Sequence, residues 1–371
     1  MGARSTARRL AAIVLATLAP NAASAQSERH IGDQRACPRC EVTVRGEHVL
    51  TGSRGVDIPA GIQAVRVDQR GRFWVLAGDE PPLMFDSAGR LLGRVGRKGA
   101  GPGEFVRPRD MVPVGGDSVL VLDAGAARFS LWSADLKPGR TIAVEGFPTP
   151  LLVEDWPAAI LGSGSVGSPS GAGWPLHRLD LSGQVAEWKS SFGPDDGAVR
   201  PGEYWRLAQV LAPARGGGFW AADEAQYRVG RWDWPSRRVF FLRRTPDWFP
   251  GTARRALGTP RTAPSPAVSA MHEDDDGLLW VFLRVPAPDW PDAWPRAAHE
   301  GGEVDYRQLD LSRLFDSIIE VIDPRSGALM ASERVAEWVI ASLPGGRIAA
   351  VEVDADGATR VRVSRVGLRR R

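Results

Sequence analysis

Long hydrophobic runs are missing from this sequence of 371 residues. No stretch approaches the roughly eighteen uninterrupted apolar residues of a transmembrane helix, so we expect no transmembrane segment in the mature chain. The most apolar run, residues 10–18, is shorter, follows three arginines and precedes the small residues Ala23-Ser24-Ala25. That order is typical of a secretory signal peptide. We therefore expect residues 1–25 to be removed and the protein to be exported, either to a periplasm or to the medium.

Cysteine is nearly absent, and both copies fall in the segment Cys37-Pro38-Arg39-Cys40. A C-x-x-C pair can be a redox centre, half of a zinc site or a local disulfide. The redox interpretation needs a strand followed by a helix, which this segment does not show. The zinc interpretation needs two further ligands at suitable spacing, and none stands nearby. In an oxidising compartment we expect a Cys37–Cys40 disulfide that closes a very short loop.

Motifs for nucleophilic and nucleotide chemistry are also missing. The chain has no G-x-S-x-G nucleophile elbow and no P-loop, because the Gly-rich residues 96–103 precede neither a helix pattern nor a G-K-[ST] triplet. The densest group of metal-ligand side chains is His272-Glu273-Asp274-Asp275-Asp276, whose spacing does not match a calcium loop. We expect a solvated acidic turn there.

Charge of one sign does not dominate either. The formal net charge is +3, and the one short basic run is the C-terminal Arg369-Arg370-Arg371. We expect this run to be a solvated tail, and we expect no nucleic-acid partner.

Glycine (42), proline (29) and tryptophan (14) are plentiful, as in proteins built of many short strands and tight turns. A repeat explains them. The segment from Asp68 to Trp74 matches the segment from Asp274 to Trp280 at its Asp, Gly and Trp positions, and residues 214–220 keep the Gly and the Trp. Each segment reads as a β-hairpin with a tight turn.

A second repeated feature is an outer hairpin, with Asp or Ser at the entry of its turn. The six positions are Asp86, Ser133, Asp180, Asp233, Asp323 and Ser364. Six copies of a four-strand unit of roughly 45 residues predict an all-β fold, a six-bladed β-propeller of four-stranded antiparallel blades.

The ends of the chain predict how the ring closes. The last copy, residues 338–367, supplies three strands, and an early strand at residues 42–50 would supply the fourth. We therefore assign residues 26–41 to an N-terminal segment with the C-x-x-C pair and residues 42–371 to the propeller. Residues 26–36 are polar, and we expect them to be poorly ordered.

Two blades share a D-x4-R pattern, with Asp123 and Arg128 in one and Asp223 and Arg228 in the other. This pattern, with the Gly-rich linker at residues 99–108, resembles the NHL repeat, and the chain is similar to exported bacterial six-bladed propellers with NHL-like repeats. The resemblance implies that these Asp and Arg residues are structural. It does not select a function, because such rings include binding platforms, lactonases and amidating lyases.

The two enzyme hypotheses require metal-ligating side chains that are scarce in this sequence. A lyase similar to the amidating enzymes would need several inward histidines, whereas the chain has five, of which we expect only His177 and His299 near the top face. A calcium-dependent lactonase would need inward Asn, which is almost absent beyond the signal peptide. We expect no cofactor. A metal-dependent hydrolase or lyase with a Ca²⁺ ion in the central channel, held by carboxylates, is the alternative.

The most distinctive region is an insertion at residues 285–317, in the fifth repeat. It carries Trp290, Trp294 and Tyr306, and Trp248 stands in the neighbouring segment between blades. In a propeller the loops between second and third strands and the linkers between blades lie on the top face. Clustered aromatic side chains are enriched at binding hot spots. We therefore favour a binding module for a protein, peptide or glycan, with these four residues as ligand-binding candidates. The alternative is that the rings pack a lid.

Overall fold

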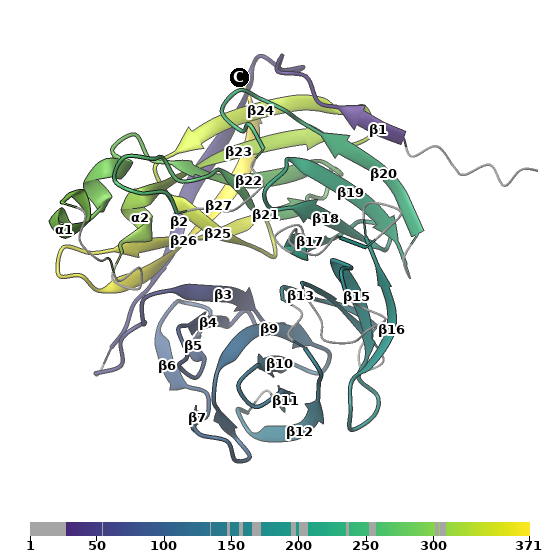
Figure 1. Ribbon diagram of the computed structural model, residues 1–371, viewed down its shortest axis with the longest axis vertical. Helices are drawn as coiled ribbons and strands as arrows, with labels where there is room; N and C mark the ends of the chain where they lie inside the picture. The colour runs from purple at the N-terminus through teal and green to yellow at the C-terminus, as the bar shows by residue number, and fades with distance from the viewer. Residues whose placement is uncertain are drawn as a thin grey trace, which may run out of the picture.

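The structure is a computed structural model. It describes residues 27–371 except 54, 134, 147–148, 156–158, 165–171, 194–197, 200–206, 235–236, 252–256, 301–303 and 305–308. Six four-stranded antiparallel sheets surround a central axis, and one of them carries an additional outer strand (Figure 1). The prediction of a six-bladed β-propeller is confirmed.

Within each blade, the strands run in chain order from the innermost strand, at the channel, to the outermost. Blades one to three contain β3 (Ile62–Val67), β4 (Phe73–Ala77), β5 (Leu83–Phe85) and β6 (Leu91–Arg94); β9 (Pro108–Val114), β10 (Ser118–Asp123), β11 (Arg128–Trp132) and β12 (Pro138–Ala143); β13 (Leu151–Asp155), β14 (Ala159–Ser163), β15 (Leu176–Asp180) and β16 (Glu187–Phe192). Blades four to six contain β17 (Gln209–Pro213), β18 (Phe219–Asp223), β19 (Arg228–Asp233) and β20 (Arg237–Arg243); β21 (Ala267–Glu273), β22 (Leu279–Pro286), β23 (Phe315–Asp323) and β24 (Ala328–Val335); β25 (Trp338–Leu343), β26 (Arg347–Val353) and β27 (Thr359–Arg370).

Hydrophobic side chains hold the blades together in pairs. Because successive residues of a strand point to opposite faces, one strand can serve two neighbouring blades. Phe73 packs with blade six, and Trp74, the next residue, packs with blade two. Middle strands such as β4 and β18 are buried along their whole length, which explains their near-continuous apolar sequences.

The repeated Asp and Trp of the first hairpin contact each other. Asp68 accepts hydrogen bonds from the backbone N–H groups of Arg70 and Arg72 and from Trp74 Nε1, the last at 2.9 Å. Asp274 does the same in blade five and accepts from Trp280 Nε1 at 2.7 Å. One carboxylate therefore closes the turn and satisfies a buried indole N–H.

The ring closes as the strand count predicts. Strand β2 (Cys40–Leu50) pairs antiparallel with β27 and becomes the fourth strand of blade six. The assignment of Ser364 to a turn is wrong: this residue is buried within β27, opposite Gly46 and Ile348. Blade six has no covalent outer hairpin, because its outer strand comes from the other end of the chain.

The prediction of a poorly ordered segment before β2 is also wrong. Strand β1 (Ser27–His30) pairs parallel with β20 as a fifth strand of blade four. Ile31 is buried, and the Ala36 N–H donates to Leu329 O in blade five. Figure 1 shows this segment, residues 27–39, following the outside of the ring from β20 past β24. We call it the N-terminal strap. It ends at the predicted disulfide, Cys37–Cys40, with the two Cα atoms 5.3 Å apart.

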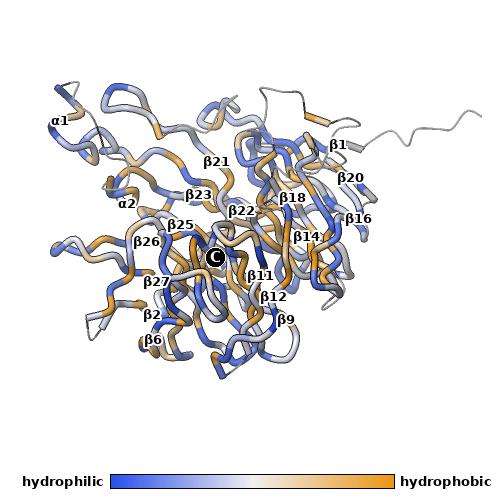
Figure 2. The backbone as a smooth tube through the Cα atoms, turned by 60° about the horizontal axis from the view of Figure 1, so that its bottom comes forward, coloured by the Kyte–Doolittle hydropathy of each residue, from blue (hydrophilic) through white to orange (hydrophobic). Residues whose placement is uncertain are grey.

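The remaining elements are short. The Gly-rich linker folds back on itself as β7 (Arg97–Lys98) and β8 (Glu104–Phe105), and the insertion contains the 3-10 turn η2 (Trp290–Ala293), α1 (Arg296–His299) and α2 (Leu311–Leu314). Figure 2 shows α1 and α2 standing off one end of the strands. Over the residues described above, no helix is long and apolar enough to cross a membrane.

Candidate functional site at the mouth of the central channel

Six inner strands surround the channel: β3, β9, β13, β17, β21 and β25. We call the end at which these strands begin the top mouth, and the end at which they finish the bottom mouth. The channel encloses a cavity of about 1250 Å³. Its walls are the exposed edges of the inner strands and the side chains at their two ends.

A β-bulge recurs at the top of four inner strands. One residue in each strand has no opposite partner in the neighbouring strand, because the register shifts there by one. The four extra residues are Gln63, Arg109, Ser269 and Ile340, and all of them line the channel. Bulges redirect side chains and are common beside functional sites. We call these four residues the bulge ring.

A charged pair joins three blades just inside the top mouth. Asp110 of β9 is 3% exposed and accepts from Arg66 Nη2 of β3 at 3.0 Å and from the Leu151 N–H of β13 at 2.7 Å. Its own neighbour, the Met111 N–H, donates at 2.8 Å. Burial raises the pKa of Asp110, and Arg66 and the two N–H donors oppose that rise. These contacts fix the position of the Arg66 side chain.

Two further arginines line the top mouth. Arg109 Nη2 lies 3.4 Å from Asp79 Oδ1, and both side chains remain partly exposed. Arg284 is buried and holds its guanidinium over the Phe315 ring, 4.8 Å from the ring centroid. Glu224 also lines the channel at this mouth.

The insertion packs against this mouth through a small hydrophobic core. Trp294, Leu314 and Phe315 are buried in it, and Trp290 is half-buried at its margin. Trp338, the first residue of β25, lies in the same core, with its ring centroid 5.8 Å from that of Phe315. Trp338 also lines the channel. The insertion therefore contacts the top mouth through Trp338.

The sequence-predicted aromatic residues are only partly brought together. Trp290 and Trp294 share the core of the insertion, where Trp294 is only 5% exposed and is held by packing. Trp248 lies elsewhere, against Phe249 in the cluster between blades four and five, with ring centroids 6.0 Å apart. Tyr306 lies outside the described residues.

The D-x4-R residues make their contacts mainly with backbone. Asp123 accepts from the N–H groups of Val106 and Arg107, and Arg128 donates to three carbonyl oxygens of the Gly-rich linker. In blade four Asp223 accepts from the Ala225 N–H at 2.8 Å. Arg228 binds Glu28 of the N-terminal strap through Nε at 3.1 Å. These contacts hold linkers and the strap in place.

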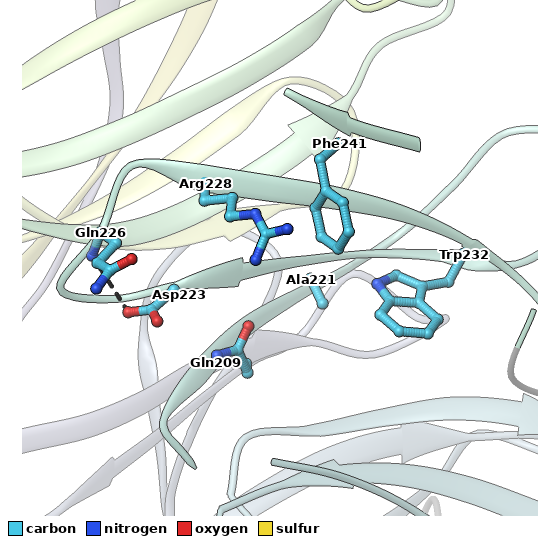
Figure 3. Close-up of a pocket in the computed structure, with 7 residues that line it drawn as sticks. All are labelled: Gln209, Ala221, Asp223, Gln226, Arg228, Trp232 and Phe241. Carbon is cyan, nitrogen blue, oxygen red and sulfur yellow. Dashed lines mark hydrogen bonds between the residues drawn. The ribbon is translucent and has the colours of Figure 1, made fainter. Parts of the chain in front are cut away.

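A second cavity lies within blade four, below Asp223 and Arg228 (Figure 3). Its polar lining comes from these two residues, Gln209 and Gln226, and its apolar wall from Ala221, Trp232 and Phe241. The cavity encloses about 20 Å³, which is room for one water molecule. It is therefore part of the interior of the blade and too small for an organic ligand.

The sequence predicts a solvated acidic turn at His272–Asp276, but His272 itself is half-buried and lines the channel at the bottom mouth. His272 and Arg66 occupy equivalent positions near the bottom ends of their inner strands, opposite Trp280 and Trp74. The Arg66 side chain, however, extends to Asp110, near the start of β9. His272 Nδ1 and Ser342 Oγ are 2.9 Å apart, which joins blades five and six, and the imidazole stacks on Trp280. Burial lowers the pKa of His272 to about 4, so the ring is neutral at pH 7.

The acidic residues after His272 divide into two kinds. Glu273 accepts from the Arg215 N–H at 2.9 Å and from Trp220 Nε1 at 2.8 Å, and Asp274 closes its own turn. Asp275 and Asp276 are exposed at the rim. The part of the chain that the structure describes contains no group of three or more His, Cys, Asp or Glu placed to hold a metal ion.

Comparison with known proteins supports the fold. No protein-family model and no curated protein sequence matches the chain. Similar solved structures include a Bacteroides fragilis protein described as exported, with a TM-score of 0.58 and 10% identity over 92% of this chain and 99% of that one. A DUF4221 family member from Bacteroides vulgatus has a TM-score of 0.61 and 11% identity over 90% and 99% of the two chains. At such low identity the likeness concerns architecture alone.

Proposed function

We propose that this protein is an exported binding module that takes its ligand at the top mouth of the central channel. The signal-peptide pattern of residues 1–25 supports export, and so does the similarity to a Bacteroides fragilis protein described as exported. The ligand would be a segment of a larger molecule, because the cavity of about 1250 Å³ exceeds the volume of ordinary small-molecule sites.

The bulge ring carries this proposal. A bulge interrupts hydrogen bonding in its sheet, so four bulges at one end of the inner strands have a cost in stability. The four bulges place four different side chains in the lining of the channel. Beside them, the core of the insertion supports Trp338. Adjacent polar and aromatic groups held by a rigid scaffold are the usual design of a recognition site.

The chemistry of the two mouths favours binding over catalysis. At the top mouth the carboxylate of Asp110 accepts three hydrogen bonds and is held as a structural partner of Arg66. Two close hydroxyl–imidazole pairs are described: Ser191 with His177, which is fully buried within blade three, and Ser342 with His272, which lies at the bottom mouth. A pKa of about 4 makes the His272 imidazole a weak general base at neutral pH.

Obstruction of the top mouth tests the proposal. Gln63 is an exposed member of the bulge ring, and its side chain donates only to Gly78 O among the described contacts. We expect Gln63→Trp to fold normally and to narrow the mouth. Gln184→Trp places the same ring on an exposed turn between β15 and β16 and is the matched control.

Each immobilised variant is incubated with the native periplasmic or secreted fraction of the source cells, and retained material is compared by mass spectrometry of proteins, peptides and glycans. We expect wild type and Gln184→Trp to retain a common component that Gln63→Trp loses by at least tenfold. Equal retention by all three variants would show that the top mouth is not the binding site.

A further inference from the structure

Charge is distributed unevenly along the channel. Arg109, Arg284, Asp110 and Glu224 line the channel at the top mouth, and the side chain of Arg66 reaches Asp110 from the lower part of β3. Four carboxylates and one arginine line the bottom mouth: Glu273, Asp274, Asp275, Asp276 and Arg365. A cleft lined by charges of one sign raises the local concentration of the opposite ion. An anionic group is therefore attracted at the top mouth and repelled at the bottom mouth.

Two of these arginines, Arg66 and Arg109, present guanidinium groups with few described partners. Arg66 uses Nη1 for Val65 O and Nη2 for Asp110, at 3.1 and 3.0 Å, and these bonds fix its plane. Arg109 has a single described partner, Asp79, whose side chain is 58% exposed. A guanidinium has five N–H donors in a planar fork that matches a carboxylate. Two neighbouring inner strands therefore present guanidinium groups to one cavity, one fixed and one weakly held.

An aromatic face lies at the same mouth. Trp338 packs into the core of the insertion and also lines the channel, so one part of its indole is supported and another part faces the cavity. A supported aromatic ring offers a large apolar contact at small entropic cost. The apolar C–H face of a pyranose ring is the natural partner of such a surface, and an arginine fork is the natural partner of a sugar carboxylate.

The bulge ring argues against an extended peptide. A peptide bound as an added strand needs a regular sheet edge, with N–H and C=O groups in sequence. At the top mouth the edges of β3, β9, β21 and β25 are each interrupted by a bulge. Bulges are one of the devices by which proteins block strand addition.

We propose that the ligand of the top mouth is an acidic oligosaccharide, with a uronic acid carboxylate on Arg109 and Arg66 and a sugar ring on Trp338. This inference rests on the proposed function and adds the chemical class of the ligand. Both arginines contact the carboxylate; Asp110 holds Arg66 in place, and Asp79 holds Arg109 more weakly.

Calorimetric titration of the mature protein tests the ligand class. The probes are tri-galacturonate, the neutral trisaccharide galactotriose and the acidic peptide tri-glutamate, all at low salt. The variants are wild type, Arg109→Gln and the control Arg70→Gln, which removes a partly exposed bottom-rim arginine paired with Asp117. We expect wild type to bind tri-galacturonate at least tenfold more tightly than galactotriose. Arg109→Gln should lose at least tenfold in affinity, and Arg70→Gln should bind as wild type does.

Three results would overturn the inference: equal affinity for the neutral sugar, tighter binding of tri-glutamate, or an Arg109→Gln variant that binds tri-galacturonate normally. If none of the probes binds while Gln63→Trp still loses the natural component, the ligand class is wrong and the site is right. If that component is also retained by Gln63→Trp, both proposals fail.

Discussion

His272 shows how a single buried residue can make the stability of the propeller depend on pH. Its folded pKa is about 4, whereas the ordinary value is 6.5, because burial disfavours the charged imidazole. The neutral form is therefore the one that the folded protein accommodates. Above pH 6.5 the buried neutral His272 does not lower the free energy of unfolding. As the pH falls from 6.5 to 4, the free energy of unfolding decreases, because the unfolded chain binds a proton at this residue before the folded protein does.

We expect His272→Gln to reduce the acid sensitivity of the protein. Between pH 7 and pH 4 the wild type should lose roughly 3 kcal/mol of unfolding free energy through this group alone, and the variant should not. Urea unfolding at the two pH values measures the difference. The exposed residue His299 serves as control, because His299→Gln should behave as wild type does. Equal losses in wild type and His272→Gln would contradict this account.

The turn carboxylates differ in how deeply they are buried. Asp68 is 5% exposed and serves two backbone N–H groups, Trp74 Nε1 and the Arg72 guanidinium. We expect Asp68→Ala to cost about 3 kcal/mol, because it leaves buried donors without an acceptor. Asp86 caps a similar turn with its partners exposed, and we expect Asp86→Ala to cost about 1 kcal/mol. Equal costs in denaturant titrations would show that burial is not the cause.

Residue-scale predictions from the sequence succeed where a role is local. The Asp and Gly of the first hairpins are recognisable because a turn is formed by neighbours in the chain. The roles of His272 and Arg66 depend on partners more than forty residues away, Ser342 and Asp110. The bulges at Gln63 and Arg109 cannot be predicted from the local sequence either, because a bulge is defined by the register of the facing strand.

At the scale of elements, the N-terminal strap is the main departure from expectation. Its residues are polar, but Arg228 and Arg244 of blade four bind Glu28, Asp33 and the carbonyl of Gly32. Arg244 also contacts blade five, because its Nε donates to the fully buried carboxylate of Glu320. The polar composition of the strap predicts disorder. The strap is nevertheless ordered, because arginines from distant parts of the chain bind it.

We expect removal of residues 26–35 to lower the midpoint of thermal unfolding by at least about 5 °C. The variant loses the burial of Ile31 and exposes the edge of β20. An exposed edge strand also favours association, so light scattering should detect dimers or larger species. The chain of residues 26–371 is the reference. A truncated protein with unchanged midpoint and mass would show that the strap is not part of the stabilised ring.

The insertion is held by its core, so its two tryptophans should differ. We expect Trp294→Ala to open the insertion and to speed proteolytic cleavage within residues 287–310 at least tenfold, because a buried indole is lost. Trp290 is half-buried, and Trp290→Ala should have a smaller effect. Equal cleavage rates for wild type and Trp294→Ala would mean that the insertion does not depend on this core.

At the scale of the whole molecule, the repeat made the fold predictable. Six apolar clusters, one between each pair of neighbouring blades, close the ring. Six copies of a four-strand unit are enough to predict that arrangement, and the count of strands also predicted the pairing of β2 with β27. The channel was not predictable in the same way. Its lining combines residues from different blades, and no single repeat contains the site.

Amide hydrogen exchange is the most direct test of the claim that the ligand binds at the top mouth. The mature protein is measured alone and after saturation with the component that wild type retains and Gln63→Trp loses. We predict protection at the starts of the inner strands, residues 62–66, 108–110 and 338–341, with little change in the outer strands. Protection confined to the outer strands β6, β12 and β16, or to the bottom turns at residues 68–72 and 274–278, would contradict the account.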